Sequence, residues 1–551
     1  MSRSVKVTQM ILAMIALALI GSLFIGGMVG GRNRDQPASP TRTGTETPSP
    51  VPSGERMPGV PATPVPEHPT MAPVSNANAD RQLSYEPQGE PSVEFEESLG
   101  SYEKYATQSV EWSECTEGGR PQCATVLVPL DWDNPEGEAI EIAINRVPGG
   151  DSSRGALFVN PGGPGFGGQS MAVSLAGRWQ NYDTYGFDPR GTGQSTHVVC
   201  GTFEESEEML TLDGSPDDAA EEQALMEGSK RFAQQCRDGS GKLLDHLTTI
   251  DVVRDLDLIR HLVGADKLNY VGVSYGTYLG VMYAQLFPDS TGRLVLDAAV
   301  EITDREPTPQ VAGFELALNN FIDWCAGSDL CDLGEDADEI RSDIDGMLTR
   351  LDQQPLQVGD RELTQSLAAL GIAVLLYEDD QAYRTLAQYL GEAIAGDGQA
   401  LLMLADLYNG RTPNSYDTPL YAFPAMGCVD GVDQGADAVL PAWRETFPKA
   451  PVMAPNMGTS FTCEFWTADS APQLEITAPD APPILVVGTT GDSATPYEQA
   501  VSMAEQLESG TLLTLEGAGH GAVTGDNSCI AEAVDKFLYD GEVPDEGTRC
   551  T

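Results

Sequence analysis

Basic residues are scarce in this chain of 551 residues, which has 31 Lys and Arg against 83 Asp and Glu and a formal net charge of −52. Proteins that bind nucleic acids or anionic membrane surfaces neutralise phosphates with clusters of Lys and Arg. The composition therefore argues against both kinds of partner. The acidic excess favours solubility, and it would also attract cationic groups such as peptide N-termini.

Motifs for metals and nucleotides are missing as well. The ten cysteines and five histidines include no C-x-x-C and no H-E-x-x-H spacing, which argues against a zinc site. The glycine-rich segment 160–165 has no G-x-x-x-x-G-K-[ST] pattern, which argues against a phosphate-binding loop. We therefore expect no metal and no cofactor.

The first segment is apolar from Met10 to Val29 and has basic residues on both sides. A run of about 20 apolar residues can span a bilayer as a helix. No A-x-A-like cleavage site is present between Gly26 and Asp35, so residues 1–30 are predicted to be an uncleaved signal anchor rather than a cleaved signal peptide. Either reading exports the body, which would be secreted or held at the cell membrane by this segment alone.

The ten cysteines agree with export, because disulfides persist in oxidising compartments. Sequence cannot prove their connectivity. We expect local pairing in chain order: Cys115 with Cys123, Cys200 with Cys236, Cys325 with Cys331, Cys428 with Cys463, and Cys529 with Cys550.

Residues 31–100 are rich in Pro, Ser, Thr, Gly and Glu, which predicts a disordered Pro-rich linker. From about residue 101, short apolar runs alternate with helical patterns, as in an α/β fold with a mostly parallel sheet flanked by helices. The predicted strands are Ala156 to Asn160, Leu268 to Val273, Arg293 to Leu296, Ile484 to Gly488 and Leu512 to Leu515.

Between residues 301 and 420 the strand pattern stops and helical patterns replace it, as in Phe314 to Trp324 and Tyr383 to Ala395. Ligands of open α/β sheets bind at the carboxyl ends of the strands. We therefore interpret 301–420 as a helical cap over that edge, inserted between two parts of the core, 101–300 and 421–551.

The most informative motif is Gly272-Val-Ser-Tyr-Gly276, which matches G-x-S-x-G. A glycine-rich chain could contain such a match by chance, so its context decides. A predicted strand precedes it and a helical pattern from Thr277 to Phe287 follows, which is the setting of a nucleophile elbow. Ser274 is therefore predicted to be a catalytic nucleophile rather than part of a packing turn.

A serine hydroxyl needs a base to take its proton. His68 lies in the predicted linker, and His246 and His261 lie at or within helical patterns. His197 precedes the elbow, which would break the chain order nucleophile, acid, histidine. His520 remains, in a glycine-rich loop directly after a predicted strand, and we predict that it is the base.

The acid that orients the histidine should follow a strand between nucleophile and base. Asp492 does so, directly after the strand that begins at Ile484. Asp297 is the rival candidate, because it ends the strand that follows the elbow helix. We favour Asp492.

An oxyanion needs backbone N–H donors. One is predicted to be the amide of Tyr275, the residue after the nucleophile. The other should come from Asn160-Pro-Gly-Gly-Pro-Gly165, a glycine loop at the end of a predicted strand, with Gly163 as the first choice and Gly162 as the second.

These motifs resemble the secreted tripeptidyl aminopeptidases of actinobacteria, relatives of proline iminopeptidase with the α/β-hydrolase fold and a TAP-like C-terminal region. The resemblance covers most of the body. It rests on the glycine loop, the elbow, the Asp492 and His520 loops, Asp188-Pro-Arg-Gly-Thr-Gly-Gln-Ser195 and Cys428-Val-Asp430. Proline iminopeptidases begin the glycine loop with histidine rather than Asn160, so the tripeptidyl group matches better.

The resemblance implies a serine peptidase that removes short peptides from free N-termini through an acyl-enzyme. Such enzymes bind the substrate ammonium with carboxylates near the cap, for which Glu378, Asp379 and Asp380 are candidates, although a solvated acidic helix start explains them equally well. The main alternative is a carboxylesterase or lipase-like hydrolase with the same triad. A non-catalytic surface protein is disfavoured by the complete set of Ser, Asp and His.

Overall fold

The computed structural model describes residues 93–116, 119–150, 153–302, 308–431 and 435–551. The predicted signal segment and most of the predicted linker lie outside these ranges. Among the residues described, no helix has the length and apolarity needed to cross a membrane.

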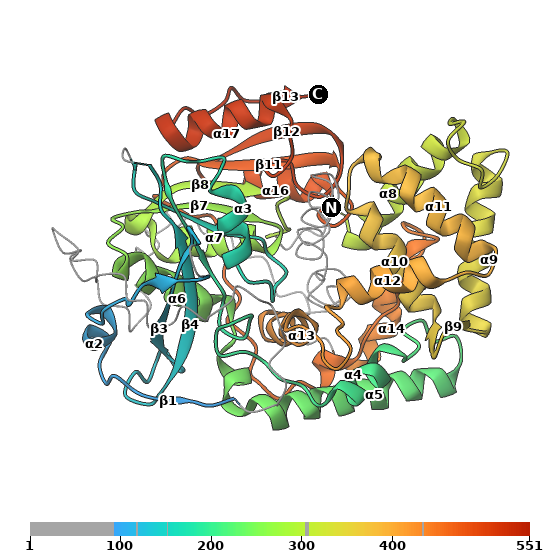
Figure 1. Ribbon diagram of the computed structural model, residues 1–551, viewed down its shortest axis with the longest axis horizontal. Helices are drawn as coiled ribbons and strands as arrows, with labels where there is room; N and C mark the ends of the chain where they lie inside the picture. Colours follow the sequence, from blue (N-terminus) through green and yellow to red (C-terminus); the bar gives the residue numbers. More distant parts are fainter. Residues whose placement is uncertain (1–92, 117–118, 151–152, 303–307, 432–434) are drawn as a thin grey trace, which may run out of the picture.

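One sheet of 11 strands organises the molecule (Figure 1). Its order is β13 (Arg549–Cys550), β12 (Gly510–Ala518), β11 (Ile484–Gly491), β8 (Thr291–Asp297), β7 (Leu268–Val273), β5 (Ala156–Asn160), β6 (Asp183–Phe187), β4 (Glu138–Val147), β3 (Gln122–Pro129) and β2 (Ser113–Glu114), with β1 (Glu96–Glu97) paired to β4. Neighbours run parallel from β13 to β6 and antiparallel from β6 to β2. The predicted mostly parallel sheet is confirmed.

The predicted strands correspond to β5, β7, β8, β11 and β12, and β5 and β7 have the predicted bounds. Their side chains alternate between two buried faces. In β5, for example, Leu157 and Val159 lie in one hydrophobic cluster and Phe158 in another. Helices cover both faces, which is why these strands are almost continuously apolar.

The helices against the sheet divide between the two clusters. On the face of Leu157 they are α3 (Gln169–Leu175) and α17 (Ser528–Asp540), and on the face of Phe158 they include α2 (Tyr102–Ala106), α6 (Thr249–Leu262), α7 (Tyr275–Leu286) and α16 (Tyr497–Gln506).

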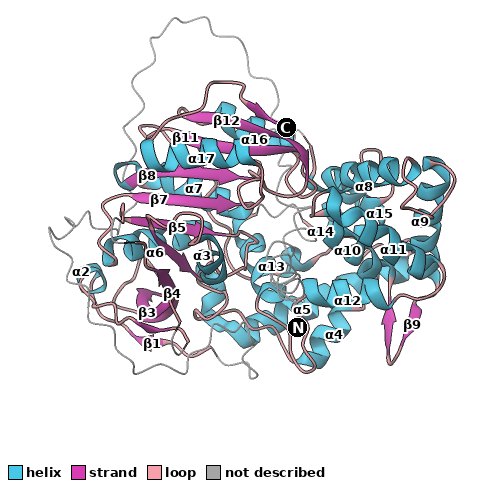
Figure 2. Cartoon of the chain, turned by 45° about the horizontal axis from the view of Figure 1, so that its top comes forward, coloured by secondary structure: helices cyan, strands magenta, loops and turns pink. Residues whose placement is uncertain are grey.

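A separate hydrophobic cluster forms the cap, which lies beside the sheet with α13 between them (Figures 1 and 2). It is built from α8 (Gln310–Ala326), α9 (Ala337–Gln353), α10 (Gln365–Leu376), α11 (Tyr383–Ile394) and α12 (Gln399–Tyr408), with contributions from α13 (Pro419–Asp430) and α15 (Met453–Met457). The remaining α-helices and strands of the described residues are α4 (Phe203–Leu210), α5 (Ala219–Ser240), α14 (Ala436–Glu445) and the hairpin of β9 (Leu356–Val358) and β10 (Arg361–Leu363). Helices continue on both sides of residue 420, so the predicted cap boundary there stays a prediction.

The predicted linker extends too far. Residues from Val93 onward, which it includes, pack on the body: Val93, Phe95 and Leu99 lie against the sheet's hydrophobic cluster, and β1 pairs with β4. These apolar side chains interrupt the polar composition that predicted disorder, and their burial fixes this part of the chain.

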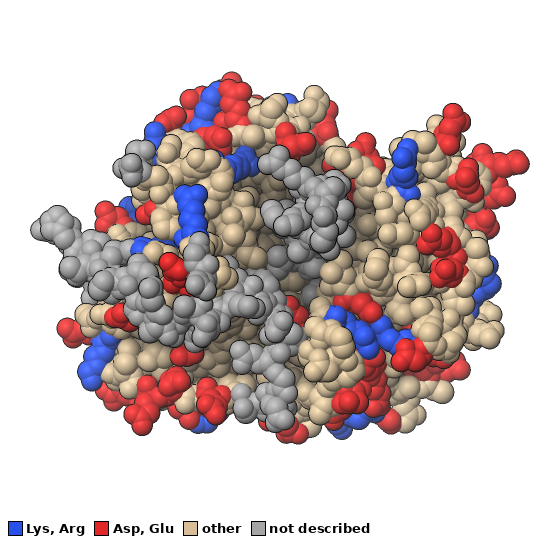
Figure 3. All heavy atoms as spheres, viewed as in Figure 1, with Lys and Arg blue, Asp and Glu red and all other residues tan. Residues whose placement is uncertain are grey.

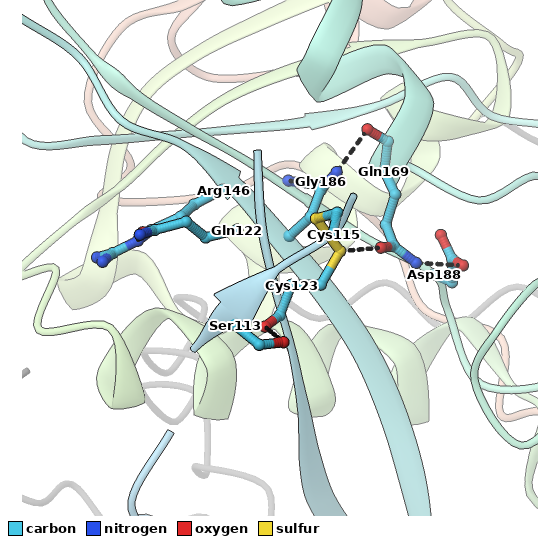
Figure 4. The surroundings of a disulfide bond; sticks show 9 residues. Ser113, Cys115, Gln122, Cys123, Arg146, Gln169, Gly186 and Asp188 are labelled. Atoms are coloured by element: carbon cyan, nitrogen blue, oxygen red, sulfur yellow. Dashed lines mark hydrogen bonds between the residues drawn. A yellow bond between two sulfur atoms is a disulfide. The ribbon is translucent and has the colours of Figure 1, made fainter. Parts of the chain in front are cut away.

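The ten cysteines form five disulfides in chain order, the pairing that local spacing suggested. Figure 4 shows Cys115–Cys123 beside Gln169.

The motif 188–195 makes buried contacts with neighbouring helices. The side-chain amide of Gln169 donates to Asp188 at 2.7 Å. Arg190 forms a fully buried ion pair with Asp255. Asp188 therefore holds the first residue of α3, and Arg190 holds α6 through Asp255.

In the view of Figure 3, acidic side chains lie mostly around the rim of the face, in several places rather than in one patch, and basic ones are fewer.

Candidate active site

Ser274 lies in a strained turn between β7 and α7. Its φ of 57° is in the left-handed region, which a non-glycine residue adopts only where the surroundings enforce it. The two motif glycines make this turn possible: a Cβ on Gly272 would lie 2.2 Å from the carbonyl oxygen of Gly276, and one on Gly276 would lie 2.7 Å from that of Asn160. The motif has the geometry of a nucleophile elbow.

His520 follows β12 in a loop that reaches the elbow. A Cβ on the next residue, Gly521, would lie 3.6 Å from Cγ1 of Val273, the residue before Ser274. The imidazole is buried, and its Nε2 has no hydrogen-bond partner among the described residues, so the Ser274 hydroxyl does not yet donate to it. The loop therefore brings a buried base, with one unpaired ring nitrogen, to the elbow without a preformed bond to Ser274. Such bonds often form only when substrate binds.

Asp492 holds the other ring nitrogen. Its Oδ1 lies 2.8 Å from Nδ1 of His520 and also accepts the N–H groups of Ala494 and Thr495. Burial alone would lower the pKa of His520, but the charge and hydrogen bond of Asp492 outweigh it and raise that pKa above its ordinary value. The imidazole is thus oriented and its cationic form is stabilised, as the base of a triad requires.

Asp297, the rival acid, has a different task. Its carboxylate accepts the N–H groups of Ala522 and Val523, just after His520. Burial raises its pKa to about 6. His520 is therefore paired with Asp492. Asp297 instead holds the backbone of the two residues that follow Gly521.

The glycine loop lies directly on the elbow. Gly162 has φ 97°, and a Cβ there would lie 2.4 Å from the carbonyl oxygen of Val273 and 2.9 Å from the nitrogen of Tyr275. The Gly162 N–H donates to Oδ1 of Asn160 at 2.9 Å, whereas no described residue accepts the N–H of Gly163. Gly163 and Tyr275 therefore stay the predicted donors, and the Asn160 side chain holds the turn at Gly162.

A chain of hydrogen bonds anchors the side chain of Tyr275. Its hydroxyl lies 2.5 Å from Oγ1 of Thr249, which donates to Oδ2 of Asp430 at 2.6 Å. The Thr249 N–H donates to the other oxygen of Asp430. Since Thr249 has a single hydroxyl proton, the Tyr275 hydroxyl must donate to Thr249. Asp430, at the end of α13, is thus linked to the residue after the nucleophile.

Two half-buried acidic residues lie near the loops of the centre. Glu378 lies beside the histidine loop, since a Cβ on Gly519 would lie 3.5 Å from the Glu378 carbonyl carbon, and Asp430 lies on the Tyr275 side. Burial raises the pKa of each to about 7, and neither pairs with a described Lys, Arg or His. Each site would gain stability from a cation.

The acidic run 378–380 separates into two kinds of residue. Asp379 is exposed and caps the turn that follows by accepting the Gln381 N–H, and Asp380 is exposed too. Asp379 and Asp380 are therefore explained as solvated residues at the start of a helical turn, whereas Glu378 is half-buried. The sequence run alone contained no signal that separated the three.

Comparisons with known proteins agree with this geometry. A family model described as alpha/beta hydrolase fold matches residues 155–339, and one described as TAP-like protein matches residues 450–550. Fold and site together define a serine hydrolase with the α/β-hydrolase fold.

Curated relatives place the chain more closely. It is 34% identical over 480 residues to serine protease Hip1 of Mycobacterium tuberculosis, covering 80% of this chain and 91% of the relative. It is 32% identical over 480 residues to tripeptidyl aminopeptidase of Streptomyces lividans, covering 81% and 87%. Carboxylesterase B of Mycobacterium tuberculosis is 32% identical over 454 residues, covering 78% and 86%. The chain belongs to the family of TAP-like α/β-hydrolases that includes these relatives.

Proposed function

We propose that this protein is an exported aminopeptidase that releases short peptides from free N-termini. Ser274 attacks the scissile carbonyl carbon, and its proton passes to Nε2 of His520. The amides of Gly163 and Tyr275 stabilise the oxyanion. The imidazolium, held by Asp492, then protonates the leaving amine, and water activated by His520 hydrolyses the acyl-enzyme.

The observation that carries the aminopeptidase proposal is the pair of half-buried carboxylates without a cationic partner. A free peptide N-terminus is a cation, and a buried carboxylate near pKa 7 gains an ion pair and becomes fully ionised when it binds one. The two relatives named as a protease and an aminopeptidase support the same reading.

Of the two carboxylates, Asp430 is the better anchor. In the acyl-enzyme geometry the leaving amine points toward His520, so the acyl peptide extends away from the histidine. Asp430 lies on the elbow side, linked through Thr249 to Tyr275, whereas Glu378 lies beside the histidine loop. We therefore assign the ammonium of the released peptide to Asp430.

The test compares free and N-acetylated tripeptidyl p-nitroanilides on the purified full chain. We expect the free substrates to be cleaved faster, and Asp430→Asn to lower kcat/KM for them by about 10- to 100-fold, because a hydrogen bond to a charged group contributes about 1.5–3 kcal/mol. Glu378→Gln is the matched control and should have a smaller effect. Equal rates on free and acetylated peptides would contradict the proposal.

A carboxylesterase remains the second candidate, since one relative bears that name. It shares the same serine, acid and histidine. p-Nitrophenyl butyrate in the same panel distinguishes them: a kcat/KM far above that for every peptide, unaffected by Asp430→Asn, would favour the esterase.

The disulfides support a proposal about location. Five bridges are typical of a protein that folds in an oxidising compartment. We propose an extracytoplasmic site, secreted or held at the membrane by the N-terminal segment. Alkaline phosphatase fused after residue 100 would be active only if that segment exports it.

A further inference from the structure

We propose that the cap is a fixed part of the catalytic centre, in which Tyr377 is a positioning residue for His520 and helix α8 supports the Asp492 loop. This goes beyond the proposed substrate, because it concerns any acyl transfer through Ser274.

Tyr377, directly after α10, contacts the catalytic histidine twice. Its backbone carbonyl oxygen accepts the backbone N–H of His520 at 2.8 Å. Its ring stands edge to face with the imidazole, with 5.2 Å between ring centroids and 89° between planes. Tyr377 is 4% exposed, so this contact excludes water from one side of the imidazole. The cap therefore fixes both the backbone and the ring of the histidine.

Helix α8 contacts the loop that carries Asp492. Gly313 packs so closely that a Cβ there would lie 2.4 Å from the carbonyl oxygen of Ser493 and 3.0 Å from that of Asp492. Nearby, Gln310 donates its side-chain amide to the carbonyl oxygen of Ala494 at 2.8 Å. Only a glycine lets the helix approach the loop this closely.

The two contacts are joined inside the cap. Phe314, next to Gly313, packs edge to face on Tyr377 with 5.2 Å between centroids and is fully buried. Movement of α8 would therefore displace Tyr377 as well. His520 and Asp492 come from different strand ends, and the cap supports both loops as one packed unit.

The first test replaces Tyr377 and measures hydrolysis of p-nitrophenyl acetate, an activated ester that does not depend on peptide recognition. Tyr377→Ala should lower kcat about 10-fold or more with little change in KM, because a loosened base loses alignment. Tyr377→Phe keeps the ring and should restore most of kcat. Titration of active sites with a fluorophosphonate separates this loss from loss of folded protein.

The pH profile gives a readout that a purely structural role would not change. In the unmodified protein, burial opposes the cationic form of the imidazole and so lowers its pKa. Tyr377→Ala should let water reach the ring, raise that pKa and shift the acid limb of kcat/KM to higher pH. The charged groups near His520, namely Asp492, Asp297 and Glu378, remain in this variant. An unchanged kcat and an unchanged acid limb in Tyr377→Ala would overturn the proposal.

The second test uses glycines of the cap. Gly313→Ala should lower kcat about 10- to 100-fold, because the added methyl group forces α8 and the acid loop apart. Gly346→Ala in α9 is the matched control: its Cβ meets only an Arg350 side-chain nitrogen at 3.6 Å, and full activity is expected. Equal kcat in the two variants would contradict the role of α8. Both tests measure ester hydrolysis, so they would still decide this proposal if the aminopeptidase proposal failed.

Discussion

In the sheet, each proposed catalytic side chain lies at or just beyond the carboxyl end of a strand, Ser274 after β7, Asp492 after β11 and His520 after β12. The cap instead contacts this centre through a backbone carbonyl, an aromatic edge and a glycine. In the sheet the identity of a side chain matters most, whereas in the cap the shape of the packed surface does. Substitutions should therefore have different signatures in the two regions.

The largest difference is expected within the sheet, between the two candidate acids. Asp492→Asn should lower kcat on an ester by about 10³- to 10⁴-fold, because it removes the charge that orients the imidazole and stabilises the imidazolium. Asp297→Asn should lower kcat by less than about 10-fold and mainly reduce Tm, since an amide oxygen can still accept the N–H groups of Ala522 and Val523. Steady-state kinetics with thermal melts checks both, and reversed effects would transfer the catalytic role to Asp297.

The glycine loop should show the next largest effect. Gly162→Ala places a methyl group 2.4 Å from the Val273 carbonyl at a positive φ, so the loop must move away from the elbow. Loss of an oxyanion donor costs about 10²- to 10³-fold in kcat. Gly177→Ala, with nothing within 4 Å of the added Cβ, is the control. A Gly162→Ala enzyme with normal kcat would exclude this loop from the oxyanion site.

The pH dependence should show the pairing of His520 with Asp492. Because that pairing raises the pKa of His520, the acid limb of kcat/KM on an ester should lie above the ordinary imidazole value of about 6.5. The active form is the neutral imidazole, so activity falls as pH drops through this limb. Asp492→Asn should shift the residual activity's limb to lower pH, and a shift to higher pH would contradict the pairing.

The smallest effects on activity should come from the disulfides, and they again separate the two regions. Cys325–Cys331 of the cap closes a separation of 6 residues, and Cys200–Cys236 of the core one of 36. Loop-closure entropy predicts losses of about 2 and about 4 kcal/mol in the free energy of unfolding for the paired Cys→Ser variants. Urea unfolding measures both, and a larger loss for the cap bridge would show that it does more than close a short loop.

The sheet could be predicted because its signals are local. A buried parallel strand is an apolar run, and the residues after it form the edge where ligands bind, so β5 and β7 and the order Ser274, Asp492, His520 follow from short segments. The parallel strand β6 and the antiparallel strands β3 and β4 are not among the predicted strands. Polar residues such as Glu141 and Arg146 interrupt the apolar run of β4, and Asp183 and Thr184 begin β6, so neither strand has the uninterrupted apolar run that identifies β5 and β7.

The contacts around the centre could not be predicted in the same way. Tyr377 and Gly313 act through positions fixed only when the cap packs on the sheet, and neither belongs to a motif. Asp430 was part of a recognised motif, but its link to Tyr275 joins residues far apart in the chain through Thr249. Side-chain burial likewise separates Glu378 from Asp379, which are adjacent in sequence.

Covalent labelling of Ser274 tests the central claim most directly. The full chain is treated with a fluorophosphonate and the modified peptide is identified by mass spectrometry, in parallel with ester and peptide hydrolysis by Ser274→Ala. We expect one label, on Ser274, and a loss of at least about 10⁴-fold in activity in Ser274→Ala. A label on another residue, or hydrolysis retained by Ser274→Ala, would contradict the account.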